Sequence, residues 1–341
     1  MDILIKSFNR PYYLDRCLFS IYKNIKGFKN IKILDDGTPE KYLKKILIKY
    51  PEVIIIKSET YLKKNKAIEE NLKTGKEING FEIPSKLWID SVKNSSNYFI
   101  ITEDDVWFTK SINVDLLSKI MKDKNISLLK LGWLGKKNKK NESMTIADDV
   151  LANQIDLFTA PYFIMNMYFF NKYKFFSLLY KLRFVNNESI GKYWELNSIL
   201  MGMYKKEYWL KIWQNNNGKV NEIRQLLNAS MYYRKHKNNK NLICQLKTEA
   251  MQTTFVSSST NSYHSYGFNF DVNIFNHIIN EKWYCDNFNP IENYPNDFSE
   301  TYITSFLDEA QNPKAKSDEW KKWAEKFKDQ YRVQGCEVDN N

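Results

Sequence analysis

The sequence has few cysteines, and they form no motif. Cys17, Cys244, Cys285 and Cys336 are scattered along 341 residues, with no Cys-x-x-Cys pair among them. A structural zinc site or a disulfide framework needs paired cysteines, so both are disfavoured. This cysteine usage is typical of a reducing compartment, and we expect a cytoplasmic protein.

The sequence also lacks two kinds of apolar segment. The opening run Met1-Asp2-Ile3-Leu4-Ile5 has no basic leader, long apolar core or small-residue cleavage site, so we expect no signal peptide. The most apolar later stretch, residues 162–170, contains Asn166 and is too short to span a bilayer. With 43% hydrophobic and 15% aromatic residues, the composition indicates a folded globular chain.

Arginine is scarce although the chain is basic. The formal net charge is +11, but only six of the 51 Lys and Arg residues are arginine. Readout of nucleic-acid bases favours arginine, and no nucleic-acid-binding module is recognisable, so we expect no nucleic-acid partner. The lysine excess is compatible with an anionic substrate, or with peripheral contact to the inner surface of a membrane.

Strand and helix patterns alternate over the first hundred residues. Predicted strands cover residues 2–8, 31–34, 53–56 and the run from Tyr98, and predicted helices cover 11–25, 39–50 and 87–93. Repeated β-α-β units favour a largely parallel sheet with helices on both faces. We therefore predict an α/β, Rossmann-like fold with a mostly parallel central sheet.

The later part of the chain has a looser pattern. We predict strands at 126–131 and 163–170, helices at 193–205 and 207–213, an exposed loop at 135–143, irregular structure after about 245, and a final helix at 318–331. Trp320, Trp323 and Phe327 share one face of that final helix. We expect this face to pack on the body, with contact to a membrane surface as the alternative.

Polar residues follow three of the predicted strands. They are Asn9-Arg10, Asp35-Asp36-Gly37 and Glu103-Asp104-Asp105. Ligands of parallel sheets bind at the carboxyl ends of the strands, so these residues form the candidate site. Three adjacent carboxylates repel one another unless they are solvated or a cation lies among them. Simpler alternatives are that both acidic runs only form turns and that Arg10 is a surface residue.

The three strand-end motifs together resemble the nucleotide-sugar-binding half of the GT-A fold glycosyltransferases, in the family-two form. The motifs are "ILIKSFNRPYYLDRCLFSIY", "IKILDDGTPE" and "FIITEDDVWF", and the last resembles the metal-binding Asp-x-Asp motif of that family. The resemblance covers residues 1–135. It implies a GT-A-like domain over 1–240, with 1–135 binding the nucleotide-sugar and 136–240 on the acceptor side, and a C-terminal extension over 241–341.

The resemblance also implies roles for these residues. Asp105 would be the direct ligand of Mn2+ or Mg2+, the cations that suit oxygen donors. Glu103 and Asp104 would contact the ribose or a metal-bound water. Asp36 would accept a hydrogen bond from the base, with Asn9 and Asp35 shaping that pocket, and Arg10 would contact the diphosphate. Lys64 and Lys66 are weaker candidates for the diphosphate.

A glycosyl transfer with inversion also needs a base to deprotonate the acceptor hydroxyl. Glu195 in "GKYWELNS" is similar to the acidic element that carries the base in inverting relatives, and Glu188 is the second choice; the alternative is that Glu195 only complements a helix N-terminus. Some metal-dependent relatives use a late histidine as a further metal ligand, which makes His264 a candidate. A structural, hydrogen-bonded histidine is the alternative.

Together these features predict a metal-dependent glycosyltransferase. It would move a sugar from a nucleoside diphosphate-sugar, UDP-linked by the resemblance, to a glycan or glycolipid acceptor in surface glycan synthesis. A sugar nucleotidyltransferase is one alternative, although no glycine-rich phosphate loop follows the first strand. A non-catalytic glycan- or nucleic-acid-binding protein is the other.

Overall fold

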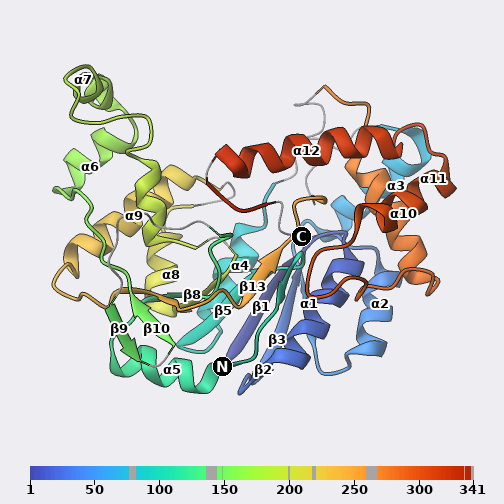
Figure 1. The fold of residues 1–341 in the computed structure, drawn as a ribbon, viewed down its shortest axis with the longest axis horizontal. Helices are drawn as coiled ribbons and strands as arrows, with labels where there is room; N and C mark the ends of the chain where they lie inside the picture. The colour runs from blue at the N-terminus through green and yellow to red at the C-terminus, as the bar shows by residue number, and fades with distance from the viewer. Residues whose placement is uncertain are drawn as a thin grey trace.

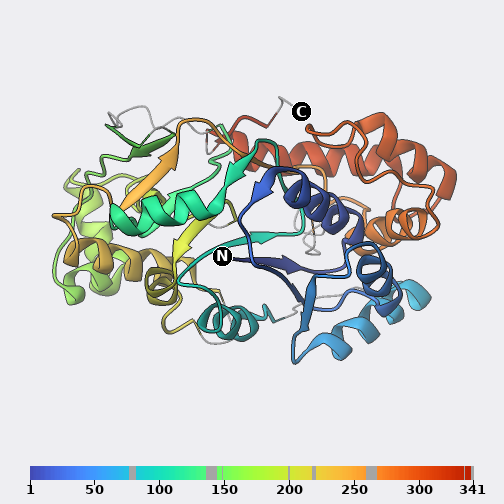
Figure 2. The ribbon, with the colours of Figure 1, turned by 90° about the horizontal axis from the view of Figure 1, so that it is seen from below.

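The protein is an α/β fold built around a nine-stranded sheet (Figures 1 and 2). This computed structural model describes residues 1–76, 82–135, 144–147, 149–198, 200–216, 220–258, 267–333 and 335–338. In spatial order, the strands are β4 (Ile54–Lys57), β3 (Asn30–Asp35), β1 (Asp2–Ser7), β5 (Tyr98–Glu103), β11 (Gly202–Lys205), β8 (Leu128–Lys130), β12 (Ile243–Leu246), β10 (Val150–Ala152) and β9 (Met144–Ala147).

The predicted mostly parallel sheet is confirmed. Strands β4, β3, β1 and β5 pair in parallel, and only β11 and β10 run against the other strands of this described sheet. Two small two-stranded sheets lie beside it, β13 (Met251–Thr253) with β6 (Val106–Phe108) and β2 (Ile25–Lys26) with β7 (Ile112–Asn113).

Helices cover both faces of the sheet, as the alternating pattern predicted. In β1, Ile3 and Ile5 join one hydrophobic cluster and Leu4 joins the other, because successive side chains of a strand point to opposite faces. The first cluster contains residues of α1 (Pro11–Asn24), α2 (Glu40–Lys49), α5 (Val114–Asp123), α10 (Val272–Tyr284), α11 (Glu300–Ala310) and α12 (Ser317–Val333). The second contains residues of α4 (Ser85–Lys93), α6 (Tyr162–Phe169), α8 (Lys206–Ile212) and α9 (Glu222–Lys235).

Two predictions of secondary structure in the middle of the chain are wrong. Residues 163–170 form most of helix α6 instead of a strand, and Met165, Tyr168 and Phe169 are its buried side, at helical spacing. An uninterrupted apolar run does not distinguish a strand from a buried helix. The predicted helix 193–205 is a 3-10 helix, η2 (Gly191–Leu196), followed by strand β11, which fills the gap between β5 and β8.

Two further segments contain helices that the sequence pattern did not predict. The lysine-rich stretch after β4 forms α3 (Tyr61–Thr74), whose buried residues Tyr61, Lys64, Ile68 and Asn71 are spaced three and four apart. After residue 245 the chain forms α10, α11 and α12, where we expected irregular structure before the last helix. Their short apolar faces are interrupted by Asn and Ser, which obscures the helical period.

The final helix packs on the body of the protein, as predicted. Trp320 and Trp323 of α12 are buried, and Trp320 Nε1 donates to the carbonyl of Val256 at 3.0 Å. The predicted boundary at residue 240 lies before β12, which is part of the central sheet. Of the predicted loop 135–143, residues 136–143 lie outside the described residues. Among the described helices, none has the length and apolarity needed to cross a membrane.

Candidate functional site

A cavity lies at the carboxyl ends of β1, β3 and β5, where the strand order reverses. Strands β3 and β4 lie on one side of β1, and β5 lies on the other. The strand order therefore reverses between β1 and β5, and the carboxyl ends of strands at such a reversal are the usual ligand position in doubly wound sheets. The cavity has a volume of about 540 Å³, within the range of small-molecule sites.

The turn after β1 is held in place by Asn9. Its backbone has a φ of 53°, a left-handed conformation that Asn tolerates better than most residues. The Asn9 backbone N–H donates to Thr38 Oγ1 at 2.8 Å, and its side chain donates to Asn273 Oδ1 of α10 at 2.8 Å. These bonds tie the end of β1 to the turn after β3 and to α10, and so position Arg10, the residue that precedes α1.

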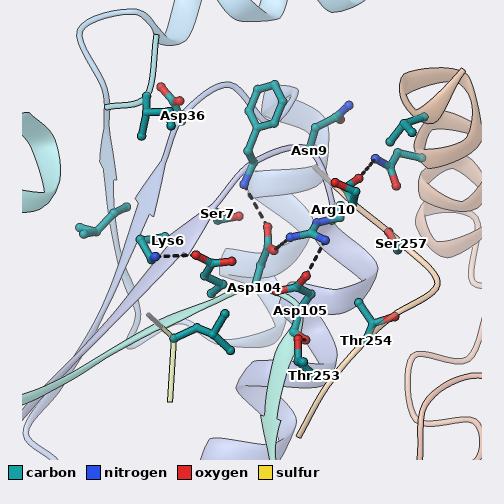
Figure 3. Close-up of a pocket in the computed structure, with 18 of the residues that line it drawn as sticks. Lys6, Ser7, Asn9, Arg10, Asp36, Asp104, Asp105, Thr253, Thr254 and Ser257 are labelled. Atoms are coloured by element: carbon teal, nitrogen blue, oxygen red, sulfur yellow. Dashed lines mark hydrogen bonds and ion pairs between the residues drawn. The ribbon is translucent and has the colours of Figure 1, made fainter. Parts of the chain in front are cut away.

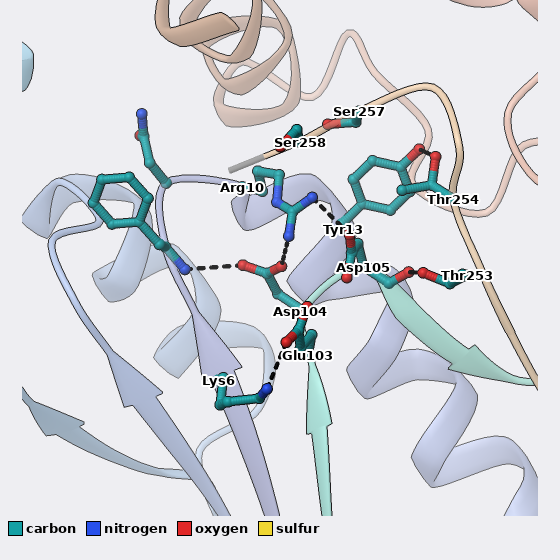
Figure 4. A network of polar contacts seen from close by, with 12 residues as sticks. Lys6, Arg10, Tyr13, Glu103, Asp104, Asp105, Thr253, Thr254, Ser257 and Ser258 are labelled. Atoms are coloured by element: carbon teal, nitrogen blue, oxygen red, sulfur yellow. Dashed lines mark hydrogen bonds and ion pairs between the residues drawn. The ribbon is translucent and has the colours of Figure 1, made fainter. Parts of the chain in front are cut away.

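Arg10 lies buried between Asp104 and Asp105 (Figures 3 and 4). One guanidinium nitrogen is 2.5 Å from Asp104 Oδ1, and the other is 2.7 Å from Asp105 Oδ2. Asp104 Oδ2 also accepts the backbone N–H of Phe8 at 3.0 Å. Glu103 pairs separately with Lys6 at 2.5 Å, as the β1–β5 register places them opposite each other. The positive charges among the three acids are therefore the side chains of Lys6 and Arg10. Arg10 is buried, so the alternative that it is a surface residue is wrong.

With both carboxylates ionised, the Arg10 group carries one excess negative charge. Burial works to lower the pKa of Arg10, but Asp104 and Asp105 raise it, so the guanidinium stays charged. Burial raises the pKa of Asp104, and the neighbouring Asp105 carboxylate raises it further, against the opposing effect of Arg10. Asp105 Oδ1 is buried and has no hydrogen-bond partner among the described residues. One guanidinium thus serves two carboxylates, and one carboxylate oxygen is left for a ligand.

The turn after β3 is organised by Asp35 and presents Asp36 to the cavity. Asp35 Oδ1 accepts the backbone N–H groups of Gly37 and Thr38 at 3.0 and 2.9 Å. Asp36 lines the cavity and forms a buried ion pair with Lys64 of α3. Gly37 has a φ of 140°, and a Cβ there would lie 2.8 Å from Lys64 Cβ, so the turn needs glycine to let α3 approach.

The charge of Asp35 makes a testable contribution to stability. Burial of the carboxylate raises its pKa from 3.8 to about 6, against the hydrogen bonds from Thr38 and Gly37, which lower it. Since this pKa is higher in the folded state, protonation favours folding, and that contribution is lost as the pH rises through 6. Asp35→Asn keeps an acceptor for the turn but does not titrate. Its stability relative to wild type should therefore fall by about 1.4 kcal/mol between pH 8 and pH 5.

Urea unfolding of both proteins across this pH range measures the effect, and Asp2→Asn is the matched control. Burial by itself would raise the pKa of Asp2. The hydrogen bond from Asn30 and the charge of Lys32 outweigh it and lower that pKa, so Asp2 titrates below pH 5. The Asp2 variant should show a constant difference from wild type over the same range. A constant difference for the Asp35 variant would contradict the prediction.

The opposite wall of the cavity comes from the C-terminal part of the chain and was not predicted. It is polar near Asp105 and aromatic near α12, and its lining includes Thr253, Thr254, Ser257, Ser258, Asn273, Asn276, Phe327 and Tyr331. Thr253 Oγ1 donates to the carbonyl of Asp105 at 3.0 Å. The signal in the sequence was the Ser-, Asn- and aromatic-rich composition after residue 245, which we interpreted only as irregular structure.

The structure gathers most of the predicted binding residues. Asn9, Arg10, Asp36, Glu103, Asp104 and Asp105 line the cavity, and Lys64 does so as well. Asp35 lies behind the cavity, where it shapes the turn. Glu188 is exposed before η2, and Glu195 lies on η2; neither lines the cavity, and the segment that carries them reaches it at Leu200. His264 lies outside the described residues.

The described residues contain no group of three His, Cys, Asp or Glu side chains that could hold a metal ion by themselves. A cation that binds together with a diphosphate needs fewer protein ligands, because phosphate oxygens and water complete its coordination. The unpartnered Asp105 Oδ1 and the excess negative charge fit a cation bound in that way. A metal site formed by protein ligands alone does not fit the described residues.

Comparison with known proteins gave matches among solved structures. No protein-family model matches the chain, and no curated protein is significantly similar. TarS 1–349 of S. aureus, solved with UDP-GlcNAc, has 12% identity and a TM-score of 0.41, over 92% of this chain and 71% of that one. Glucosyl-3-phosphoglycerate synthase from Mycobacterium tuberculosis, solved with Mn2+, UDP-glucose and phosphoglyceric acid, has 11% identity and a TM-score of 0.38, over 84% and 80%.

A third structure is the galactosyltransferase LgtC with donor and acceptor sugar analogues. It has 11% identity and a TM-score of 0.35, over 74% of this chain and 86% of that one. The present chain spans 42% of the longer TarS chain that was also solved. All of these similarities are low, and the geometry of the cavity is what bears on function.

Proposed function

We propose that this protein is a glycosyltransferase that takes a sugar from a nucleoside diphosphate-sugar and passes it to an acceptor hydroxyl. The observation that carries the proposal is the buried Arg10–Asp104–Asp105 group at the carboxyl ends of β1 and β5. The order β4-β3-β1-β5 is that of the first four strands in doubly wound nucleotide-binding sheets. All three family-like motifs contribute residues to this one cavity.

The donor base is expected to bind at Asp36. A carboxylate accepts hydrogen bonds, and the rings of uracil, thymine and guanine each carry an N–H that can donate to it. Cytosine has only an acceptor at the corresponding ring nitrogen. The pairing of Asp36 with Lys64 holds the carboxylate at the cavity wall. We therefore propose a UDP-sugar as the donor and expect a cytidine donor to bind more weakly.

The diphosphate is expected to lie beside Arg10 and Asp105. Arg10 Nε is buried and makes no hydrogen bond within the described residues, so it can donate to a phosphate oxygen. Mn2+ or Mg2+ would be held through Asp105 Oδ1, and when bound it would neutralise the charge on the leaving diphosphate. Asp104 and Glu103 would accept hydrogen bonds from the ribose hydroxyls or from water.

The acceptor is proposed to enter from the side of Leu200. A base must take the proton of the acceptor hydroxyl, and Glu195, five residues before Leu200, stays our first candidate, with Glu188 second. Transfer with inversion and a glycan or glycolipid acceptor remain parts of the same proposal. Glu195 does not line the cavity in this structure, so it would have to move toward the cavity to act as the base.

A thermal-shift screen tests the donor assignment directly. UDP, dTDP, GDP, CDP and CMP are each added with Mn2+ or with EDTA. Because a ligand that binds only the folded state raises its stability, UDP with Mn2+ at a hundredfold excess over Kd should raise Tm by roughly 4 °C. CDP and CMP should give a smaller shift. An equal shift for CDP would remove Asp36 from base recognition, and no shift with any nucleotide would contradict the proposed function.

A further inference from the structure

Helices α6 and α7 form an arm that projects from one end of the molecule. The arm comprises residues 158–184, with α6, a 3-10 turn η1 (Lys172–Lys174) and α7 (Phe175–Lys181). In Figure 1, α7 lies at the upper left, at the margin of the molecule and away from the central sheet. No residue of the arm lines the cavity described above. The proposed reaction therefore gives the arm no role.

The arm exposes a concentration of large apolar side chains. Eight of the 18 exposed large hydrophobic residues in the described chain belong to it, although it is 27 residues long: Phe158, Tyr162, Phe163, Tyr173, Leu178, Tyr180, Leu182 and Phe184. Tyr173 is 92% exposed and Phe184 is 75% exposed. Single exposed hydrophobics need no explanation, but a concentration of them on one projecting arm points to an interaction surface.

The charges of the arm are all positive. Between Asp156 and Glu188 the sequence contains no acidic residue, although 40 of the 341 residues are Asp or Glu. The same interval contains Lys172, Lys174, Lys181 and Arg183, which are all exposed. These four cations form no salt bridge with any residue that the structure describes. The arm therefore presents these positive charges next to exposed aromatic and aliphatic side chains.

The tip of the arm combines both properties. Asn171, Tyr173 and Lys174 have left-handed backbone conformations, with φ between 48° and 57°, which reverse the chain tightly between α6 and α7. The turn leaves Tyr173 almost fully exposed between Lys172 and Lys174. Aromatic rings flanked by Lys are the side chains that prefer the interface of a bilayer, where the ring is buried and the ammonium meets anionic headgroups.

We propose that the arm docks on the surface of a membrane that contains anionic lipid. Lipid headgroups supply the negative charge that the arm lacks, and the acyl boundary accepts its apolar side chains. A second copy of the chain fits less well, because a symmetric contact would bring two sets of four cations together without any acid of the arm. In Figure 1, the arm rises to the same side toward which β1 runs, the side of the cavity.

Sedimentation with vesicles tests the role of charge. The wild-type protein should bind vesicles of phosphatidylcholine with 30% phosphatidylglycerol at low salt, and binding to pure phosphatidylcholine should be much weaker. Each cation near an anionic surface contributes roughly a fivefold increase in partitioning, so Lys172→Gln with Lys174→Gln should reduce it by roughly 25-fold. The matched control is Lys122→Gln with Lys124→Gln, an exposed pair with the same spacing at the end of α5, which should bind like wild type.

A second pair of variants tests the role of the apolar side chains. Phe163→Ser with Tyr173→Ser should reduce binding by roughly tenfold, because two exposed rings no longer enter the interface. Ile48→Ser with Leu62→Ser, which are 82% and 72% exposed on α2 and α3, is the control and should leave binding unchanged. All these side chains are exposed, so every variant should keep the Tm of the wild type.

Two results would overturn the proposal. One is wild-type protein that does not sediment with anionic vesicles at low salt. The other is arm variants that bind as well as the controls do. A dimer seen by light scattering that the arm variants abolish, in a protein that does not bind vesicles, would instead assign the arm to a second copy. The nucleotide-induced shift should be the same in all variants, so a failure here is separate from a failure of the proposed function.

Discussion

Arg10→Met is expected to lower the free energy of unfolding by about 3–5 kcal/mol at pH 8. The substitution leaves the largely buried Asp104 and Asp105 carboxylates without the cation that pairs with both of them. The loss should become smaller at pH 5, because protonation removes the unpaired charges. Urea unfolding at both pH values measures the change.

A triple variant separates the ion pairs from simple packing at Arg10. In Arg10→Met with Asp104→Asn and Asp105→Asn, the uncompensated charges are gone, so most of the lost stability should return. Arg10→Met should also lose UDP binding, since the proposed phosphate contact is removed. A single variant as stable as wild type at pH 8, or a triple variant no better than the single one, would show that Arg10 does not balance these acids.

Asp105→Asn is expected to abolish the Mn2+-dependent part of UDP binding and to reduce transfer by roughly a thousandfold. Asn can still accept the hydrogen bond from Arg10, but it removes the excess negative charge that the cation would meet. Burial raises the pKa of Asp105, so its charge is costly in the folded state, and the variant should be at least as stable as wild type. Calorimetric titration of UDP with Mn2+ and with EDTA, together with Tm, gives both readouts.

Glu195→Gln provides the contrast for that variant. If Glu195 is the base, this variant should bind UDP and Mn2+ like wild type and lose only transfer to the acceptor. Wild-type turnover by the Glu195→Gln variant would show that another residue acts as the base. For Asp105→Asn, an unchanged Mn2+-dependent affinity would remove Asp105 from the proposed site, and a large loss of stability would mean that its role is structural.

The strand-end part of the site could be predicted because it depends on local pattern. A buried strand such as β5, followed by acids, is recognised within about ten residues, and parallel strands bring their carboxyl ends to one edge of a sheet. Asn9, Asp36 and Asp105 were found in this way. Their partners were not, because the Asn9–Asn273 bond joins residues 264 positions apart, and no local pattern records such a contact.

Other errors have a similar physical origin. Helix α6 was assigned the wrong type because its apolar run fits either structure. Strand β11 was missed because its four residues, Gly202–Lys205, are too few to show a period, and tertiary packing decides both. Residues 163–170 of the arm were predicted as a core strand and nothing was predicted for residues 171–184, so the exposure of the arm was unforeseen. The tryptophans of α12, which offered the earlier membrane alternative, are buried instead, and the exposed aromatic residues lie on α6 and α7.

The sequence by itself determined the fold class, the order of the first β-α-β units and the acids at the strand ends. These follow from the spacing of apolar residues and from the rules of parallel sheets, which act over short stretches of chain. Only the tertiary structure decided that Arg10 and Lys6 pair with those acids, that C-terminal residues such as Thr253 and Tyr331 line the cavity, and that the arm is exposed. Charge pairing and burial depend on contacts between distant parts of the chain, which exist only after folding.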